Sequence, residues 1–324
     1  MRSYVKCAQI AAVLIFSLLL LEYGLRAVKA WTVDGCLYIG APSINSRLDP
    51  KYGWFSPKSF RVYKKNVCYG EGPVTYNEQG FRAPPPSEAT NADLVICILG
   101  DSTMQGYQIP DGGHLPHLLQ HELQKTYHKP YVLPLAVGGY GSVQEWMLFE
   151  EFGRPLHPTA VIWNWSGNDP QNNDYVAERY FGPINNNVRP RPYLEDGRIV
   201  IRHPYPLHIC DPIDELIIFR LLNGILLKLT ARPASELPSH LDNGWKVGDE
   251  MISRVAGEVD HKIALIAAGD DRAINMFRAH GYRIAEYSYP KGCDCLPKDS
   301  HPTTKGHQYM LQALLPVLRE ELGR

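Results

Sequence analysis

The chain has 324 residues, a formal net charge of −1 at pH 7, 44% hydrophobic residues and 21% charged residues. This composition is typical of a globular protein and excludes an intrinsically disordered chain. A net charge this close to zero offers no electrostatic basis for binding nucleic acid, so we expect no nucleic-acid partner. The length suffices for one large α/β domain with an extension, or for two domains.

An apolar run near the N-terminus predicts a membrane-targeting segment. It extends from Cys7 to Leu21, contains two polar residues and follows two basic ones. A membrane-spanning helix needs roughly 17–25 residues, and the run reaches that length when it is continued to Val28. We predict that residues 1–30 form an uncleaved anchor, with everything after about residue 30 on one side of the membrane. A cleaved signal peptide is the competing interpretation, although residues 28–30 make a poor cleavage site.

Residues 31–92 are rich in proline, glycine, tyrosine and asparagine and contain only short apolar stretches. Turn-forming sequences at 49–54 and 76–82 predict short strands. A linker is one interpretation of this composition. Five aromatic residues favour instead an extension that packs on the main domain: Tyr52, Trp54, Phe55, Phe60 and Tyr63.

From residue 93 onward, apolar strands and amphipathic helices alternate. The six apolar residues at 94–99 predict a strand that is buried on both faces. The elements predicted after it are helix 114–127, strand 131–137, helix 142–152, strand 160–165, helix 248–257, strand 262–267, helix 271–280, strand 283–287 and helix 303–320. Such alternation predicts parallel βαβ units with right-handed crossovers.

An insertion at 170–212 interrupts the alternation. It is rich in asparagine, proline, arginine and tyrosine and has no helical period. An insertion of this length in an α/β domain is usually a lid or a binding loop. A helix is predicted next, at 212–230, and it is apolar around much of its circumference, so we expect it to be buried or to face lipid. Residues 232–245 are predicted to be loop.

Polar motifs follow the first three strands of this domain and precede the last helix. Gly100-Asp101-Ser102 ends the first strand, where open α/β sheets place their chemistry. Gly139 follows the second strand, where glycine lets a backbone N–H approach a ligand, and Asn168 follows the third, where its amide can donate to an oxyanion. Asp299 and His301 come shortly before the last helix. Each motif alone also fits an ordinary turn.

Together, and in this order, these motifs resemble the blocks of the SGNH/GDSL hydrolase superfamily over roughly residues 93–324. The resemblance implies an α/β fold, a three-layer α/β/α flavodoxin-like sandwich with a mostly parallel central sheet. It also implies that Ser102 is the nucleophile of a triad with His301 and Asp299. The oxyanion hole would then consist of the N–H groups of Ser102 and Gly139 and the amide of Asn168. The resemblance calls for no metal and no organic cofactor.

Two positions depart from the pattern of this family. Pro134 stands where the family often has an asparagine, five residues before the oxyanion glycine. Lys298 stands where the family commonly has its acid, three residues before the histidine. Asp299 is then the nearest carboxylate, Asp294 is a second choice, and a Ser-His dyad would remain if neither reached His301. We expect His307 to be a residue on the face of the last helix.

The implied reaction is nucleophilic acyl transfer. We expect a serine ester hydrolase, an acyl or acetyl esterase, whose substrate is an ester such as an O-acetylated glycan or a lipid. The N-terminal anchor and the stretches at 49–54 and 77–82 are similar to membrane-anchored bacterial members, which implies an extracytoplasmic catalytic domain, periplasmic or extracellular. The alternatives are an O-acyltransferase that modifies an envelope polysaccharide and a non-catalytic binding module with the SGNH fold.

The seven cysteines show neither a CxxC pair nor the spacing of a zinc site. If the domain is exported, two disulfides are possible: one between Cys36 and Cys68, or one between Cys210 and either Cys293 or Cys295. Cys293 and Cys295 are too close in sequence to bridge each other easily.

Overall fold

The computed structural model describes residues 2–28, 30–33, 36–39, 47–180, 189–203, 206–214, 216–232, 236, 238–296 and 299–323. A five-stranded sheet forms its centre, with the strands β7 (Leu94–Gly100), β8 (Pro130–Ala136), β9 (Ala160–Asn164), β12 (His261–Ala267) and β13 (Arg283–Tyr287). All pairs are parallel and the spatial order is β13-β12-β9-β7-β8. This is the flavodoxin-like order, in which the chain reverses direction across the sheet between the first and third strands, β7 and β9.

Helices cover both faces of the sheet, so the predicted three-layer α/β/α sandwich is confirmed. One face is covered by α3 (Leu115–Leu123) and α11 (Thr304–Glu321), and the other by α4 (Ser142–Leu148), α9 (Pro238–Ala256) and α10 (Asp271–Ala279). Side chains of β7 alternate between the two layers because successive residues of a strand point to opposite faces. Ile96 and Ile98 join the first layer, whereas Cys97 and Leu99 join the second.

The prediction of loop at 232–245 is wrong, because α9 already begins at Pro238. Glycines and polar residues hide the helical period in its first half. One of these glycines, Gly244, is required by close packing: a Cβ there would lie 1.8 Å from the carbonyl oxygen of Pro170 in α5 (Asp169–Asn172). The helix is therefore held by contact with a distant turn, which local sequence does not reveal.

The insertion contains short elements that its composition did not predict. These are α5, α6 (Tyr175–Tyr180), the hairpin of β10 (Arg191–Glu195) and β11 (Arg198–Arg202), and α7 (Asp211–Asp214). The helix predicted at 212–230 is α8 (Ile217–Thr230). Residues 181–188 and 204–205 of the insertion lie outside the described part of the chain.

The segment before β7 forms antiparallel hairpins. They are β1 (Ala30–Val33) with β2 (Cys36–Ile39), β3 (Arg47–Asp49) with β4 (Gly53–Phe55), and β5 (Phe60–Asn66) with β6 (Gly70–Tyr76), followed by the 3₁₀ helix η1 (Pro86–Asn91). Of the five aromatic residues singled out from the sequence, Tyr52, Trp54 and Phe55 are buried in the layer of α4, α9 and α10, Phe60 is half-buried, and Tyr63 is exposed.

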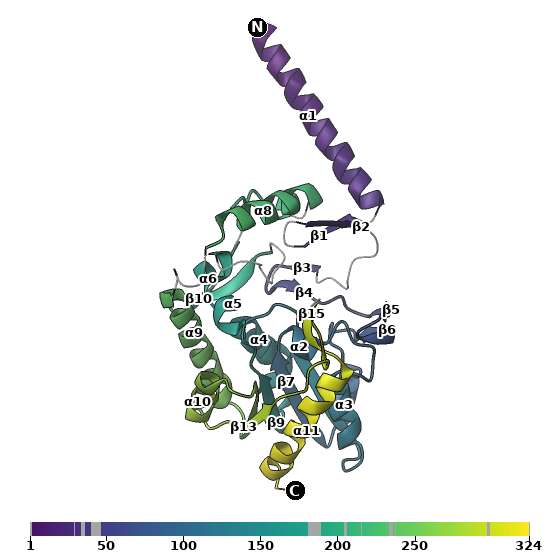
Figure 1. Ribbon diagram of the computed structural model, residues 1–324, viewed down its shortest axis with the longest axis vertical. Coiled ribbons are helices and arrows are strands. Elements are labelled where there is room, and N and C mark those ends of the chain that lie inside the picture. The colour runs from purple at the N-terminus through teal and green to yellow at the C-terminus, as the bar shows by residue number, and fades with distance from the viewer. Residues whose placement is uncertain are drawn as a thin grey trace.

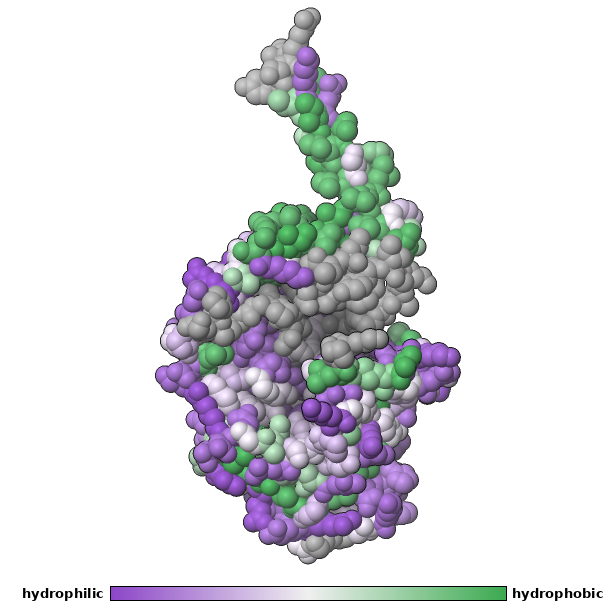
Figure 2. Space-filling view, viewed as in Figure 1, coloured by the Kyte–Doolittle hydropathy of each residue, from purple (hydrophilic) through white to green (hydrophobic). Residues whose placement is uncertain are grey.

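The N-terminal helix α1 (Arg2–Ala27) projects away from the sandwich (Figure 1). From Val5 to Ala27 it is long and apolar enough to cross a membrane, and a signal sequence meets the same criteria. Figure 2 shows hydrophobic residues along this helix and along α8 at its base.

Candidate active site

The sharp turn after β7 presents Ser102 at the carboxyl edge of the sheet. Ser102 is the first residue of the one-turn helix α2 (Ser102–Gln105). Asp101 caps this helix, since its Oδ1 accepts the N–H of Thr103 at 3.0 Å. Because β7 and β9 flank the point where the strand order reverses, Ser102 lies where such sheets bind ligands.

Three side chains form a hydrogen-bonded line at this edge. The hydroxyl of Ser102 lies 2.6 Å from Nε2 of His301, and Nδ1 of His301 lies 2.5 Å from Oδ1 of Asp299. His301 and Asp299 belong to β15 (Asp299–Pro302), which pairs with β14 (Asp294–Cys295). In an extended strand residues two apart share a face, so a carboxylate two positions before the histidine reaches its ring.

The other candidate residues near this loop do not join the line. Asp294 accepts instead the N–H of Leu296 at 3.4 Å, and Lys298 lies outside the described residues. His307, expected on a helix face, is buried in α11, where its Nδ1 accepts the N–H of Leu115 at 3.2 Å. Pro134 lies in β8, an edge strand, and an edge is where a sheet tolerates proline.

Charge distribution prepares His301 to accept a proton. Burial lowers the pKa of His301. The hydrogen bond and the negative charge of Asp299, with the charge of Asp101, raise this pKa by more than burial lowers it, so the net pKa lies above its ordinary value. Burial likewise opposes ionisation of Asp299, whereas the hydrogen bonds and charge of His301 favour it, and the net pKa of Asp299 is lowered. Asp299 is therefore ionised at neutral pH and accepts from Nδ1, which leaves Nε2 as the acceptor that faces Ser102.

The turn after β8 offers a backbone donor beside Ser102. The N–H of Gly138 donates to Oε1 of Gln105 at 2.9 Å, and the N–H of Tyr140 donates to Val137. The N–H of Gly139, between them, has no partner among the described residues. Gly139 has a φ of +78°, a left-handed conformation that favours glycine.

Trp54 determines the direction of that free N–H. Its indole Nε1 donates to the carbonyl oxygen of Gly138 at 3.0 Å. The C=O of Gly138 and the N–H of Gly139 belong to the same peptide plane and point in opposite directions when the peptide is trans. By holding the carbonyl on one side, Trp54 aims the N–H of Gly139 to the other.

Arg191 of β10 holds the next peptide group, between Gly139 and Tyr140. Its guanidinium donates to the carbonyl oxygen of Gly139 and, at 3.2 Å, to that of Asn172. It is almost fully buried, forms an ion pair with Glu178 at 2.8 Å and lies 4.9 Å from the ring centroid of Trp54. The insertion thus supports the glycine turn.

Asp101 connects the turn after β7 to the turn after β9. Its carboxylate accepts the hydroxyl of Ser166 at 3.1 Å and Nδ2 of Asn168 at 3.3 Å. An amide nitrogen carries two hydrogens, so Asn168 retains a second donor for a ligand. The structure therefore brings Asn168 to the same sheet edge as Ser102 through Asp101.

Residues of the N-terminal extension also hold the turn that carries Ser102. The buried guanidinium of Arg82 donates to the carbonyl oxygens of Gln105, at 3.3 Å, and Gly106, and it pairs with Asp111 at 2.9 Å. The side chain of Gln105 donates to the hydroxyl of Ser56 at 2.9 Å.

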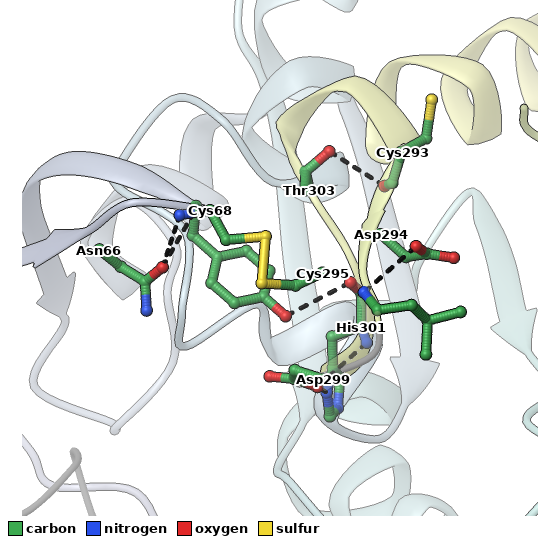
Figure 3. Close-up of a disulfide and its surroundings, with 10 residues drawn as sticks. Asn66, Cys68, Cys293, Asp294, Cys295, Asp299, His301 and Thr303 are labelled. Carbon is green, nitrogen blue, oxygen red and sulfur yellow. Dashed lines mark hydrogen bonds and ion pairs between the residues drawn. A yellow bond between two sulfur atoms is a disulfide. The ribbon is translucent and has the colours of Figure 1, made fainter. Parts of the chain in front are cut away.

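A disulfide joins the extension to the histidine loop. Cys68, in the turn between β5 and β6, is bonded to Cys295 of β14, close to Asp299 and His301 (Figure 3). The neighbouring Tyr69 donates its hydroxyl to the carbonyl oxygen of His301 at 3.4 Å and also lowers the pKa of Asp299 by hydrogen bonding. The disulfide between Cys36 and Cys68, which the sequence left possible, is therefore wrong. The thiols of Cys210 and Cys293 are free.

Trp54, Tyr69, Arg82 and Arg191 were not predicted as site residues. Trp54 and Arg82 fall within the stretches at 49–54 and 77–82 that are similar to membrane-anchored bacterial members, and that similarity was the available signal. Nothing in the local sequence of Tyr69 or Arg191 distinguishes them from surface residues.

One group of metal-ligand side chains occurs in the described ranges. His203, His208 and Asp214, in the insertion and α7, have ligand atoms within 4.8 Å of one another. Nδ1 of His208 lies 2.5 Å from the carboxylate of Asp214, so a direct hydrogen bond already accounts for this contact. Ser102, Asp299 and His301 do not belong to it.

No protein-family model matches the sequence, and no similar curated protein was found. Among solved structures the chain is similar to TesA, with 13% identity, a TM-score of 0.40, and coverage of 70% of this chain and 99% of that chain. It is also similar to the psychrotrophic esterase EstA from Pseudoalteromonas sp. (11% identity, TM-score 0.39, 72% and 100% covered). A third is the acetylxylan esterase Axe2 from Geobacillus stearothermophilus (11% identity, TM-score 0.40, 70% and 94% covered). Identities and TM-scores this low carry no argument about the activity of the chain.

Proposed function

We propose that the protein is a serine ester hydrolase of the SGNH/GDSL type. The observation that carries this proposal is the hydrogen-bonded line from Asp299 through His301 to Ser102, at the edge of the sheet where a free backbone N–H and an amide also lie. A nucleophile in contact with a base that is itself oriented by a carboxylate is the recurrent arrangement for acyl transfer.

The first half-reaction acylates Ser102. Nε2 of His301 accepts the hydroxyl proton while the serine oxygen attacks the ester carbonyl carbon, and Asp299 stabilises the imidazolium without being protonated. The N–H groups of Ser102 and Gly139 and the amide of Asn168 donate to the oxyanion. Loss of one such donor typically costs about 10²–10³ in rate. His301 then protonates the departing alcohol.

The second half-reaction releases the acid. Water takes the place of the alcohol, His301 accepts its proton, and the hydroxide attacks the acyl carbon. Collapse of the second tetrahedral intermediate returns the proton to Ser102 and restores the starting state. The first and last proton transfers use the contact of 2.6 Å between Ser102 and His301, and the same Nε2 exchanges the proton with the alcohol and the water.

The test is turnover of p-nitrophenyl acetate together with labelling by a fluorophosphonate probe. We expect Ser102→Ala to abolish both. Ser253→Ala, which alters an exposed serine on α9, is the matched control and should retain both. Unchanged turnover in Ser102→Ala would exclude Ser102 as the nucleophile. Absence of labelling in the folded wild-type protein would favour a non-catalytic binding module.

We further propose that α1 is an uncleaved anchor and that the catalytic domain lies outside the cytoplasm. The disulfide between Cys68 and Cys295 supports an oxidising compartment, because disulfides persist there and are rare in the cytosol. The intact mass of the mature protein and its resistance to alkaline extraction from membranes test the anchor. A mature chain that begins after α1 would identify a signal peptide instead.

An O-acyltransferase that modifies an envelope polysaccharide is the second candidate. It is favoured by a pocket between the insertion and α9, whose lining includes the polar side chains of Tyr175, Glu195, His240 and Asn243. Hydroxyl and amide groups beside an aromatic ring suit a sugar acceptor. Product analysis with an acetyl donor and an oligosaccharide separates the two: an acetylated sugar formed in preference to free acetate identifies the transferase.

A further inference from the structure

Helix α8 carries an outward face that is entirely apolar. Ile218, Leu222, Ile225 and Leu229 recur at the spacing of one helix face, and the last three are 43%, 41% and 77% exposed. The opposite face, which includes Ile217, Gly224 and Leu227, is buried. The two charged residues of the helix, Arg220 and Lys228, lie outside the apolar row. A continuous exposed apolar row of this kind marks an interaction surface.

The start of α8 is tied to the end of α1. Glu22, buried in α1, accepts the N–H of Ile217 at 3.1 Å and that of Ile218 at 3.2 Å. A carboxylate at this position satisfies backbone donors that the first turn of a helix leaves without partners. Arg26 donates to the same carboxylate at 2.7 Å. The contact holds the start of α8 against Glu22, which lies five residues before the end of α1.

This contact sets the depth of α8. At 1.5 Å per residue, the apolar span Val5–Ala27 measures about 33 Å, which is close to the thickness of the hydrocarbon core of a bilayer. Glu22 and Arg26 lie in the last turns of this span, near its end, and the first turn of α8 lies at the same end. Figure 1 shows α8 beside the lower end of α1, and Figure 2 shows that the two apolar surfaces are adjacent.

We propose that α8 is an interfacial membrane helix, which inserts its apolar row into the leaflet from which α1 emerges. An amphipathic helix in this position buries its apolar face at the boundary between headgroups and acyl chains. The catalytic domain is thereby held at the membrane surface at two places, which restricts its rotation about α1. The proposal depends on α1 crossing the bilayer, which is part of the proposed localisation, and does not depend on the esterase chemistry.

The test uses the full chain, reconstituted in vesicles of phosphatidylcholine and phosphatidylglycerol. Cys7→Ser and Cys210→Ser remove the two exposed free thiols of the described side chains, and Cys36→Ser removes a further cysteine. Single cysteines are then introduced by Leu229→Cys on α8, Leu14→Cys on α1 and Ser253→Cys on α9, and each is labelled with a polarity-sensitive fluorophore. Unchanged thermal unfolding identifies the variants that retain the fold.

A lipid with a nitroxide near the top of its acyl chain should quench the label at 229 by about two-fold or more, and a lipid with the nitroxide near the end of its chain should quench the label at 14. Neither lipid should quench the label at 253. Quenching at 14 without quenching at 229 overturns the assignment of α8 and leaves the anchor intact. Quenching at neither position overturns both. An emission at 229 that is blue-shifted yet insensitive to the nitroxide lipid shows that protein, such as a second copy of the chain, covers the row, and also overturns the proposal.

Discussion

Trp54→Phe tests how the proposed oxyanion donor, the N–H of Gly139, is positioned, separately from the rest of the site. The substitution keeps an aromatic ring in the buried position between Tyr140 and Arg191, but it removes the indole N–H that donates to Gly138 at 3.0 Å. The peptide between Gly138 and Gly139 is then free to rotate, and its N–H loses its fixed direction.

The expected loss comes from the bond that is removed. A neutral intramolecular hydrogen bond contributes about 0.5–1.5 kcal/mol, and a buried carbonyl left without a donor costs about 1–3 kcal/mol. If about 1–2 kcal/mol of this appears in the transition state, kcat falls by about 5- to 30-fold. Complete loss of the donor, about 10²–10³, is the upper limit. KM should change little, because the donor acts on charge that develops only in the transition state.

The assay is steady-state turnover of p-nitrophenyl acetate, with the rate of fluorophosphonate labelling as a second readout. Trp163→Phe is the matched control: Trp163 is equally buried, and its indole donates to Glu145 at 2.6 Å within the core of the sheet. Both variants should unfold at lower temperature, but only Trp54→Phe should lose kcat. Equal values of kcat in the two variants would refute the reasoning, whether both fall or neither does.

Three further outcomes are expected. Asp299→Asn should lower kcat by a factor on the order of 10³–10⁴, because the amide can stabilise neither the required tautomer of His301 nor its imidazolium; a loss below about ten-fold would indicate a Ser-His dyad. Since the pKa of His301 is raised and catalysis needs its neutral form, kcat/KM should fall as the pH decreases through a value above about 6.5, and the inflection of Asp299→Asn should lie at lower pH. Reduction of the disulfide, or Cys68→Ser, should lower kcat and slow fluorophosphonate labelling, because Cys295 lies in the strand that pairs with the strand of His301. Activity that is unchanged after reduction, with loss of the disulfide verified by thiol titration, would contradict a supporting role for the disulfide.

The sequence alone predicted the sheet, because burial leaves a local record. The uninterrupted apolar run of β7 reflects its burial on both faces. The helical period of apolar residues in α3 and α11 reflects burial of one face of each helix. The polar residues that end β7, β8 and β9 could be assigned to one edge, since parallel strands share their carboxyl ends. The spacing of Asp299 and His301 was ambiguous until the loop was found to be extended, with both side chains on one face.

The contacts that support the site were decided only by tertiary structure. Trp54 meets Gly138 across 84 positions of the chain, and Cys68 meets Cys295 across 227. Such pairs depend on where whole hairpins dock, and no local periodicity records that placement. The same holds for α8: its apolar row is evident in the sequence, but its depth beside α1 is set by the contact between Glu22 and Ile217, which only the fold brings together.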